Sequence, residues 1–416
     1  MRTSLHEKGR PWSELESEML AWRREDVNWR EGRAAVYVFH SGDDVMQVAH
    51  DAYGLFIAEN GLGPGAFPSL KRMEREVVDM ALGLQRVPEG GAGSMTSGGS
   101  ESIFMAVKAC RDWSRANMPS EGAPQIVAPY SAHPAFDKAA HLLGLEVVRV
   151  PLGAGYLADV DAMAEAISPR TIMLVGSAPC FPYGVIDPIE ALSELAESRG
   201  IWLHVDACVG GYLSPFVAAL GVDLPVWDFR LAGVTSMSLD LHKYGYAAKG
   251  ASTVLYRYRD HRDAQVFHFD DWPCGHMYTP TLAGTRPGGA IAAAWAVLNY
   301  LGWEGYVERA RRILQARGQL LEGLETLGLA VYGDPLLSIV AFGAGRGEEL
   351  DMLAVGEGLY REGWFSSRVR DPDGVQLMLS PEHDRSMGVY LDVLARWVER
   401  GRRGELGRGD SNIRYS

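Results

Sequence analysis

Short apolar runs alternate with segments of helical periodicity between residues 125 and 211. Apolar runs of about 4–8 residues are typical of strands buried on both faces of a parallel sheet. The helical segments between them supply the crossovers that parallel neighbours require. The alternation therefore predicts an α/β fold with a mostly parallel sheet and helices on both faces. Strands are expected at residues 125–128, 146–150, 171–175, 202–205, 234–238 and 252–256, and helices at 135–143, 159–166 and 189–198.

Residues 235–250 read TSMSLDLHKYGYAAKG and contain the pair His242-Lys243. Lysine is the side chain that can hold an aldehyde cofactor as a Schiff base, and the hydroxyls of Ser236 and Ser238 could face a phosphate. A His-Lys pair alone is more often a solvated surface dipeptide. The catalytic interpretation of Lys243 therefore depends on two further stretches.

The first of these is the apolar run at residues 203–208, which contains Asp206 and is followed by Gly210-Gly211. It predicts a buried strand whose C-terminal end presents Asp206, where open α/β sheets bind ligands. A buried carboxylate needs a cationic partner, and the protonated ring nitrogen of pyridoxal phosphate would be one. An aspartate that only caps the next helix is the alternative.

The second stretch, residues 95–102, reads MTSGGSES and precedes a helix-like run at 103–113. Glycines let the backbone approach an anion, Ser97 and Ser100 add hydroxyl donors, and a helix N-terminus supplies free N–H groups. The stretch predicts a phosphate-binding cup, although it has neither the Rossmann nor the P-loop spacing.

Together with three other stretches, these segments resemble the fold-type I pyridoxal-phosphate enzymes of the group II decarboxylase superfamily, and most of all the sphingosine-1-phosphate lyases. The resemblance implies the PLP-dependent transferase-like fold, with a seven-stranded type of sheet and a small C-terminal α/β domain. The matching stretches keep the family's order and are residues 96–113, 131–140, 175–188, 203–211, 229–250 and 281–289.

The resemblance also implies roles for individual residues. Lys243 would be the Schiff-base lysine, Asp206 would partner the pyridine nitrogen, and His133 would stack on the ring of the cofactor, pyridoxal 5'-phosphate. Contacts with the cofactor phosphate are implied for Gly99, Ser100, Ser238 and His242, and for Arg286 and Gly288 of a neighbouring subunit. A homodimer with shared active sites is therefore expected.

The chain departs from the resemblance on the substrate side. Phe39 aligns with an active-site tyrosine of the family, and only a gap of two residues would place Tyr37 there instead. Gly63 stands where those lyases have the histidine of Asn-Pro-Leu-His. A phenyl ring cannot move a proton, so another base is needed. Tyr183, Tyr37 and the substrate phosphate itself are candidates. Tyr183 could serve if a lysine or the pyridinium lowers its pKa, and the alternative is a tyrosine that only packs in its turn.

The chain has 416 residues, and its 40 basic and 53 acidic residues give a formal net charge of −13. This charge argues against nucleic acid or an anionic membrane as the main partner. The four cysteines form no CxxC pair, which fits a cytoplasmic protein, and no stretch approaches the roughly 18 apolar residues of a membrane span. Asp270 and Asp271 lie near two histidines, but no His-x-x-x-His spacing supports a metal site.

Four parts of the chain are expected. These are an N-terminal helical arm at residues 1–60, a large cofactor-binding domain at 61–310, a small C-terminal domain at 311–400 and a loose tail at 401–416. Amphipathic patterns favour helices at residues 13–33, 44–60, 69–84, 291–301, 305–324 and 386–400, and the small domain is expected to have strands near 330–332, 337–342 and 374–379.

The expected function is a carbon–carbon lyase that cleaves a phosphorylated amino alcohol by retro-aldol chemistry, giving an aldehyde and a phosphoamine. Decarboxylation of an amino acid is the alternative, because both reactions break a bond at Cα and use the ring as electron sink. The two differ because the retro-aldol reaction also needs a base for the substrate hydroxyl. A Rossmann oxidoreductase is disfavoured because Gly-x-Gly-x-x-Gly is absent. A non-catalytic binding module would not need these groups in order along one sheet.

Overall fold

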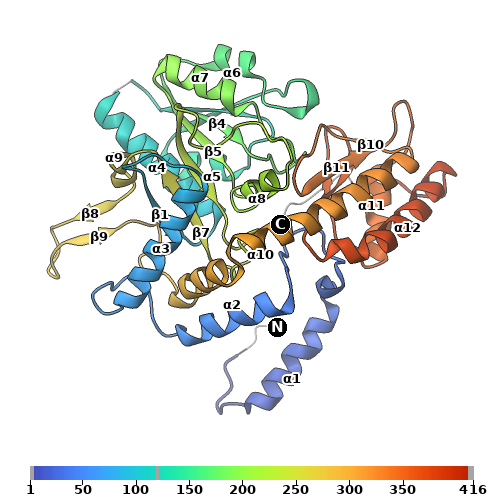
Figure 1. Ribbon diagram of the computed structural model, residues 1–416, viewed down its shortest axis with the longest axis horizontal. Coiled ribbons are helices and arrows are strands. Elements are labelled where there is room, and N and C mark those ends of the chain that lie inside the picture. Colours follow the sequence, from blue (N-terminus) through green and yellow to red (C-terminus); the bar gives the residue numbers. More distant parts are fainter. Residues whose placement is uncertain (1–3, 119–120, 411–416) are drawn as a thin grey trace.

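The computed structural model describes residues 4–118 and 121–410, which contain a seven-stranded sheet and a separate four-stranded sheet (Figure 1). The large sheet has the order β1-β7-β6-β5-β4-β2-β3. Five neighbouring strands run parallel, while β7 is antiparallel to both β1 and β6. The predicted α/β class is confirmed. The strands are β1 (Ala92–Thr96), β2 (Gln125–Pro129), β3 (Glu146–Val150), β4 (Thr171–Ser177), β5 (Trp202–Asp206), β6 (Val234–Leu239) and β7 (Ser252–Tyr256).

Helices cover both faces of this sheet because side chains alternate along each strand. Ile126 and Val175 belong to one apolar cluster with Phe136 and other buried residues of α4 and α5. Val127 and Leu203 belong to a second cluster, which includes residues of α7 and α10. The shorter elements around the sheet are α4 (Gly99–Asn117), α5 (Ala135–Leu143), η3 (Ala154–Tyr156), α6 (Val160–Ala166), α7 (Ile189–Arg199), α8 (Ser214–Ala219) and α9 (Arg259–Asp263).

The long helix α10 (Gly288–Thr326) leads from the large sheet to the small one (Figure 1). Two helices were expected here, at residues 291–301 and 305–324. Two helical stretches are present as expected, and they meet within α10 at Gly302, whose φ of 54° and ψ of −173° are not helical. This conformation favours glycine, because a Cβ would clash with the backbone.

The small sheet is antiparallel, with the order β10-β11-β13-β12. The expected tail is ordered at least to Asp410, because the N–H groups of Gly409 and Asp410 donate to Asp351 and Glu357 near α11. Residues 411–416 lie outside the described residues, and the domain boundaries stay a prediction. The elements are β10 (Ala330–Val331), β11 (Ile339–Gly343), α11 (Met352–Arg361), β12 (Ser367–Val369), β13 (Gly374–Met378) and α12 (His383–Arg402).

The N-terminal part consists of helices that pack unequally on the rest of the chain. Helix α2 lies along α10, whereas α1 has no buried residue and exposes Trp12, Met19, Leu20 and Trp22 (Figure 1). An apolar stripe left exposed in this way is typical of a surface that another molecule covers. The elements are α1 (Trp12–Trp22), η1 (Arg23–Glu25), η2 (Trp29–Glu31), α2 (Asp43–Leu55) and α3 (Pro68–Leu84).

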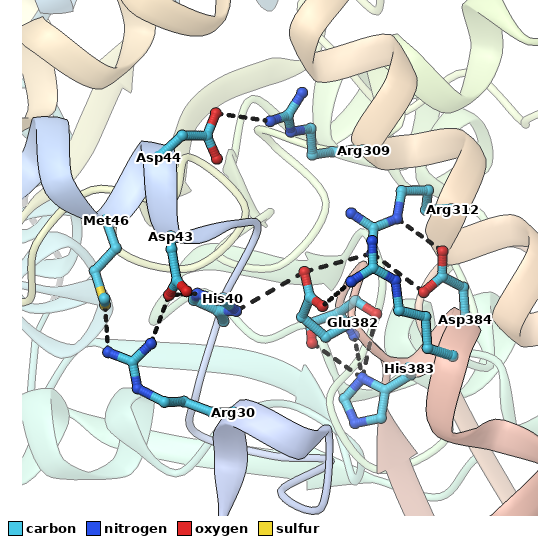
Figure 2. A network of polar contacts seen from close by, with 12 residues as sticks. Arg30, His40, Asp43, Asp44, Met46, Arg309, Arg312, Glu382, His383 and Asp384 are labelled. Atoms are coloured by element: carbon cyan, nitrogen blue, oxygen red, sulfur yellow. Dashed lines mark hydrogen bonds and ion pairs between the residues drawn. The ribbon is translucent and has the colours of Figure 1, made fainter.

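A network of charged side chains ties the start of α2 to α10 and to the start of α12 (Figure 2). His40 lies between Asp43 and Glu382, with nitrogen–oxygen distances of 3.4 and 3.9 Å. Arg312 of α10 donates to Asp384 at 2.7 Å and lies 3.4 Å from Glu382. The segment that precedes α2, and with it the neighbouring Phe39, is therefore held against both helices.

A two-stranded hairpin, β8 (Phe267–Phe269) and β9 (Met277–Thr279), projects from the large domain (Figure 1). Its tip pairs His276 with Asp270, and His276 lies 3.4 Å from His268. In the described part of the chain, no three His, Cys, Asp or Glu side chains are arranged to hold a metal ion. None of the helices in the same ranges is both long and apolar enough to cross a membrane.

Candidate active site

The candidate site is built where β5 and β6 end. These strands pair in parallel, with His204 opposite Ser236 and Asp206 opposite Ser238. Alternate residues of a strand face the same side, so these four side chains share one face of the sheet. The C-terminal ends of parallel strands are where α/β sheets bind ligands, and Asp206 lies at such an end as predicted.

Lys243 forms an ion pair with Asp240, which sequence reasoning did not single out. The Lys243 amine lies 2.9 Å from Asp240 Oδ2, and the Asp240 side chain is buried. Burial alone would lower the pKa of the lysine and raise that of the aspartate, but their attraction outweighs it: the pKa of Lys243 is raised and that of Asp240 is lowered. Because attack on an aldehyde needs a neutral amine, Lys243 must first release a proton to a neighbour or to solvent.

The expected phosphate cup lies beside this ion pair. Helix α4 begins at Gly99, and a Cβ added to Gly99 would lie 2.7 Å from Asp240 Oδ2 and 2.8 Å from Cys208 Sγ. Gly98 is also tightly packed, though less so, since its Cβ would lie 3.2 Å from the ring of His242. Ser100 is exposed at the same helix N-terminus. The structure thus places Gly99 against Asp240 and Gly98 against His242, beside Lys243, and the phosphate contacts of Gly99, Ser100 and His242 stay a prediction.

His242 is fixed in place by backbone contacts. Its Nδ1 accepts the N–H of Ala251 at 3.2 Å, and its Nε2 lies 3.8 Å from Asp240 Oδ2. Burial lowers the pKa of His242 to about 4. A neutral imidazole whose Nδ1 accepts must carry its proton on Nε2, so His242 can serve as a hydrogen-bond donor there.

Glu101 reinforces the turn that leads into α4. Its carboxylate accepts the N–H of Ser97 at 2.6 Å and the N–H groups of Leu282 and Ala283 at 2.9 and 3.3 Å. The loop at residues 281–289 is therefore joined to the start of α4, although the two are far apart in sequence.

Asp206 is a buried carboxylate, 8% exposed. Its Oδ1 accepts the backbone N–H of Cys208 at 3.0 Å and the hydroxyl of Ser238 at 3.3 Å. No lysine or arginine within residues 4–118 and 121–410 forms an ion pair with it. The site therefore offers a buried negative charge to a cationic ligand group.

Ser238 points its hydroxyl towards Asp206. Its hydroxyl is completely buried between Asp206, His204 and Cys208, at 3.3, 3.2 and 3.3 Å. The register of β5 and β6 turns Ser238 towards Asp206, so its implied phosphate contact gains no support from these hydrogen bonds and stays a prediction.

His133 lies in the loop after β2, half-buried at the wall of a cavity of about 810 Å³. Its Nδ1 accepts the N–H of Ala135 at 3.1 Å, which orients the ring. Burial lowers the pKa of His133 and so favours the neutral ring. A neutral, oriented imidazole is suited to stacking on a flat ligand.

Tyr183 lines the same cavity but does not meet the condition for a base. Burial raises its pKa to about 12, and its hydroxyl donates to the carbonyl of Asp371 at 2.9 Å. Its ring stacks on Tyr156, with centroids 4.5 Å apart. The proposal that Tyr183 acts as a base with a lowered pKa is corrected, and its contacts are those of a packing residue.

Lys249 is a residue that sequence reasoning did not assign to catalysis. Its amine lies 4.7 Å from the centre of the Phe39 ring and donates to the carbonyls of Tyr37 and His242 at 3.0 and 3.2 Å. Part of the Lys249 side chain is exposed at the surface, but the protein packed around its amine and the charge of Lys243 lower its pKa to about 8. The only available signal was its place six residues after Lys243 in a stretch otherwise poor in charge.

Arg286 and Gly288 are not grouped with Lys243. Arg286 forms a bidentate ion pair with Glu74, and a nitrogen of its guanidinium lies 3.4 Å from the carbonyl of Gly61. The N–H of Gly288 donates to Glu59. Arg286, Gly288 and their partners surround the loop that contains Gly63. A cavity of about 460 Å³ at this place is not lined by Lys243.

The sheet, the lysine and aspartate at adjoining strand ends and the glycine cup define a pyridoxal-phosphate enzyme of fold type I. The pyridoxal-dependent decarboxylase conserved domain matches residues 25–342, and the chain belongs to that family. It is therefore a PLP-dependent lyase.

Three relatives illustrate the similarity. The sphingosine-1-phosphate lyase of Dictyostelium discoideum is 38% identical over 93% of this chain and 72% of its own length. A Burkholderia pseudomallei sphingosine-1-phosphate lyase structure is 36% identical, with a TM-score of 0.92 over 97% of this chain and 94% of that one. A probable L-aspartate decarboxylase of Pyrococcus abyssi is 34% identical over 84% of this chain and 90% of its own length.

The residues present fit pyridoxal phosphate. Asp206 offers a buried charge without a cationic partner, the Asp240 Oδ1 atom is buried without a hydrogen bond in the described structure, and a side chain at Gly99 would fill the cup. Lys243 supplies the amine that an aldehyde requires, and the α4 N-terminus faces the same place.

Proposed function

We propose that this enzyme cleaves a phosphorylated amino alcohol by retro-aldol chemistry, releasing an aldehyde and a phosphoamine. The observation that carries the proposal is the similarity of nearly the whole chain to sphingosine-1-phosphate lyases, at 36% to 38% identity, together with the grouping of Lys243, Asp206 and the Gly99 turn. The amine or amino-acid substrate is a small molecule in either of the reactions considered.

The cofactor-facing residues divide the work of binding. Lys243 would hold the aldehyde carbon covalently, Asp206 the ring nitrogen, and His133 the ring face, while the start of α4 and His242 would hold the phosphate. When bound, pyridoxal phosphate supplies a conjugated ring that accepts the electron pair released when a bond at the substrate Cα breaks. Asp206 supports this by keeping a proton at the ring nitrogen.

Lys249 is proposed as the base for the substrate hydroxyl. With a pKa of about 8, roughly a tenth of its amine is neutral at pH 7, and this neutral form can accept that proton. The hydroxyl oxygen then forms the aldehyde carbonyl, the Cα–Cβ bond breaks, and its electron pair stays with Cα. A proton from Lys243, whose raised pKa keeps it charged, completes the phosphoamine. Phe39 lines a cavity together with Lys249 and takes no proton.

An anionic group of the substrate has a matching cation in the cavity beside His133. Arg370 lines this cavity and forms no ion pair or hydrogen bond to another described side chain. The turn that carries it is anchored by Tyr183 and Tyr332, which donate to the carbonyls of Asp371 and Asp373 at 2.9 and 2.7 Å. An unpaired guanidinium on an anchored turn suits a phosphate or carboxylate.

A homodimer with shared sites is also proposed. Arg286 and Gly288 lie apart from Lys243 within the chain, and an arginine from a second copy would complete the phosphate site. Helix α1 supports the proposal, because its exposed Trp12 and Trp22 would be covered by a partner. A cytoplasmic location is proposed as well, supported by four cysteines that form no disulfide.

Decarboxylation remains the second candidate, and the similarity to a probable L-aspartate decarboxylase favours it. Purified enzyme should be incubated with a sphingoid-base phosphate and, separately, with L-aspartate and L-glutamate. Aldehyde and phosphoethanolamine from the first substrate support the proposal. Carbon dioxide from an amino acid, without aldehyde from any phosphorylated amino alcohol, would overturn it.

A further inference from the structure

A continuous chain of buried hydrogen bonds leads to Asp206 from inside the sheet. The indole N–H of Trp202 lies 2.6 Å from Ser236 Oγ, which lies 2.7 Å from His204 Nδ1. His204 Nε2 lies 3.2 Å from Ser238 Oγ, and that hydroxyl lies 3.3 Å from Asp206 Oδ1. Both serines and His204 are completely buried, so water does not compete for these groups.

The chain follows from the register of two strands. Trp202, His204 and Asp206 are alternate residues of β5, and Ser236 and Ser238 are alternate residues of β6. His204 and Asp206 stand opposite Ser236 and Ser238. One face of two adjoining strands therefore carries an uninterrupted polar row, in a sheet whose other buried side chains are mostly apolar.

The donor and acceptor inventory gives this row one direction. An ionised carboxylate only accepts, so Ser238 gives its single hydroxyl proton to Asp206. Ser238 must then accept from its other neighbours, which places a proton on His204 Nε2. Burial lowers the pKa of His204 to about 4, so the ring is neutral and its Nδ1 carries no proton. Ser236 then donates to Nδ1 and accepts from the indole of Trp202, which can only donate.

We propose that His204 is a positioning residue for the reaction: it holds Ser238 as a donor to Asp206 and so keeps that carboxylate aimed at the ring nitrogen. The dipoles of the row all point towards Asp206, and hydrogen bonds in series polarise one another. The proposal rests on Asp206 as the partner of the ring nitrogen. Its first consequence, the protonation of His204, does not depend on the reaction that the enzyme catalyses.

The tautomer of His204 can be measured on the holoenzyme without any substrate. Protein labelled with ¹⁵N-histidine should show, for the signals that His204→Gln removes, a neutral ring with the proton on Nε2 at neutral pH. A ring protonated on Nδ1, or a charged ring, would reverse the direction of the row and overturn the proposal.

The role in catalysis needs a test that separates positioning from damage to the fold. His204→Phe keeps an aromatic ring without either nitrogen, and His204→Gln keeps an N–H within reach of Ser238. We expect kcat to fall roughly ten- to a hundredfold in His204→Phe and in Ser238→Ala, with KM little changed, and to recover partly in His204→Gln.

Reconstitution with N-methylated pyridoxal phosphate provides the decisive comparison. The methyl group fixes a positive charge on the ring nitrogen. Asp206 is then no longer needed to keep a proton on that nitrogen. The ratio of the wild-type kcat to that of His204→Phe should fall towards one with this cofactor. The dissociation rate of the natural cofactor, followed by its visible absorption, should rise in His204→Phe but not in His204→Gln.

An unchanged kcat ratio with the methylated cofactor would show that His204→Phe harms the fold and would overturn the proposal. The kcat ratios of wild type and His204→Phe are all measured with the same assay and the same substrate. That substrate can be an amino alcohol phosphate or an amino acid. A failure of the lyase assignment is seen instead as a different product.

Discussion

Replacing Gly99 by alanine tests whether the start of α4 forms the phosphate cup. The new Cβ would lie 2.7 Å from Asp240 Oδ2 and 2.8 Å from Cys208 Sγ. Ordinary contacts of carbon with heavy atoms begin near roughly 3.5 Å, so the new atom would be about 0.7 Å too close. Neither neighbour can easily yield, since Asp240 is buried and paired with Lys243, and Cys208 is buried against Ser238.

The helix end must therefore move, and the groups that face the phosphate move with it. Overpacking of this kind costs about 1–3 kcal/mol. If cofactor binding loses the same free energy, the Kd of the cofactor rises by roughly 5- to 150-fold. Cofactor titration followed by quenching of intrinsic fluorescence gives the Kd, and circular dichroism of the apoenzyme gives the change in Tm.

Gly388→Ala is the matched control, because Gly388 lies inside helix α12 with nothing within 4 Å of its added Cβ. It should raise stability by about 0.5–1 kcal/mol and leave the Kd unchanged. If Gly99→Ala bound the cofactor with wild-type affinity, the cup would lie elsewhere and the reasoning from Gly99 would be refuted.

Four other outcomes are expected. Lys243→Ala should lose the adduct that borohydride reduction traps, and an adduct mapped to Lys138 or Lys249 in the wild type would contradict the assignment. Asp206→Ala should retain cofactor through the phosphate but lose several orders of magnitude in kcat, and near-normal turnover would refute its role. Mixing inactive Lys243→Ala and Arg286→Ala subunits should restore activity through one competent site in each heterodimer. If no activity is recovered, the result counts against active sites shared between subunits. The kcat/KM of the wild type should rise as pH increases through about 8, because only the deprotonated amine of Lys249 can act as a base. Lys249→Gln should lose that rise. If the variant kept it, another residue would be the base.

The parallel strands were predictable because strands that are buried on both faces consist of continuous runs of apolar residues. The expected strands at residues 171–175 and 202–205 agree with β4 and β5, in which every residue is buried. Strand β1 was not predicted. Its residues, AGSMT, are small or polar, and the strand is stabilised by antiparallel pairing with β7, from Ala92 opposite Tyr256 to Thr96 opposite Ser252. A local pattern does not show a partner so far away in sequence.

The site was predictable to the same extent and for the same reason. Lys243 and Asp206 follow apolar runs, so their place at strand ends could be inferred. The partners of each group depend on which side chains of adjoining strands face each other. The row from Trp202 through His204 is visible in the sequence only as alternate polar positions, and the hydrogen bond of Ser238 to Asp206 was not predicted because the register of the two strands was unknown. The pairing of Arg286 with Glu74 likewise joins helix α3 to a loop more than 200 residues later.

Phe39, one of the two departures from the resemblance, lies beside the amine of Lys249. A tyrosine at position 39 would bring a hydroxyl near this amine, whereas Phe39 brings only a ring face, 4.7 Å away. The amine then keeps two backbone carbonyls as its hydrogen-bond partners, and neither can take up its proton. With no carboxylate paired to it and Lys243 nearby, the balance of burial and charge favours the neutral form, which is why its pKa is lowered. With a phenyl ring at position 39, Lys249 is the neighbouring group that we propose as the base for the substrate hydroxyl.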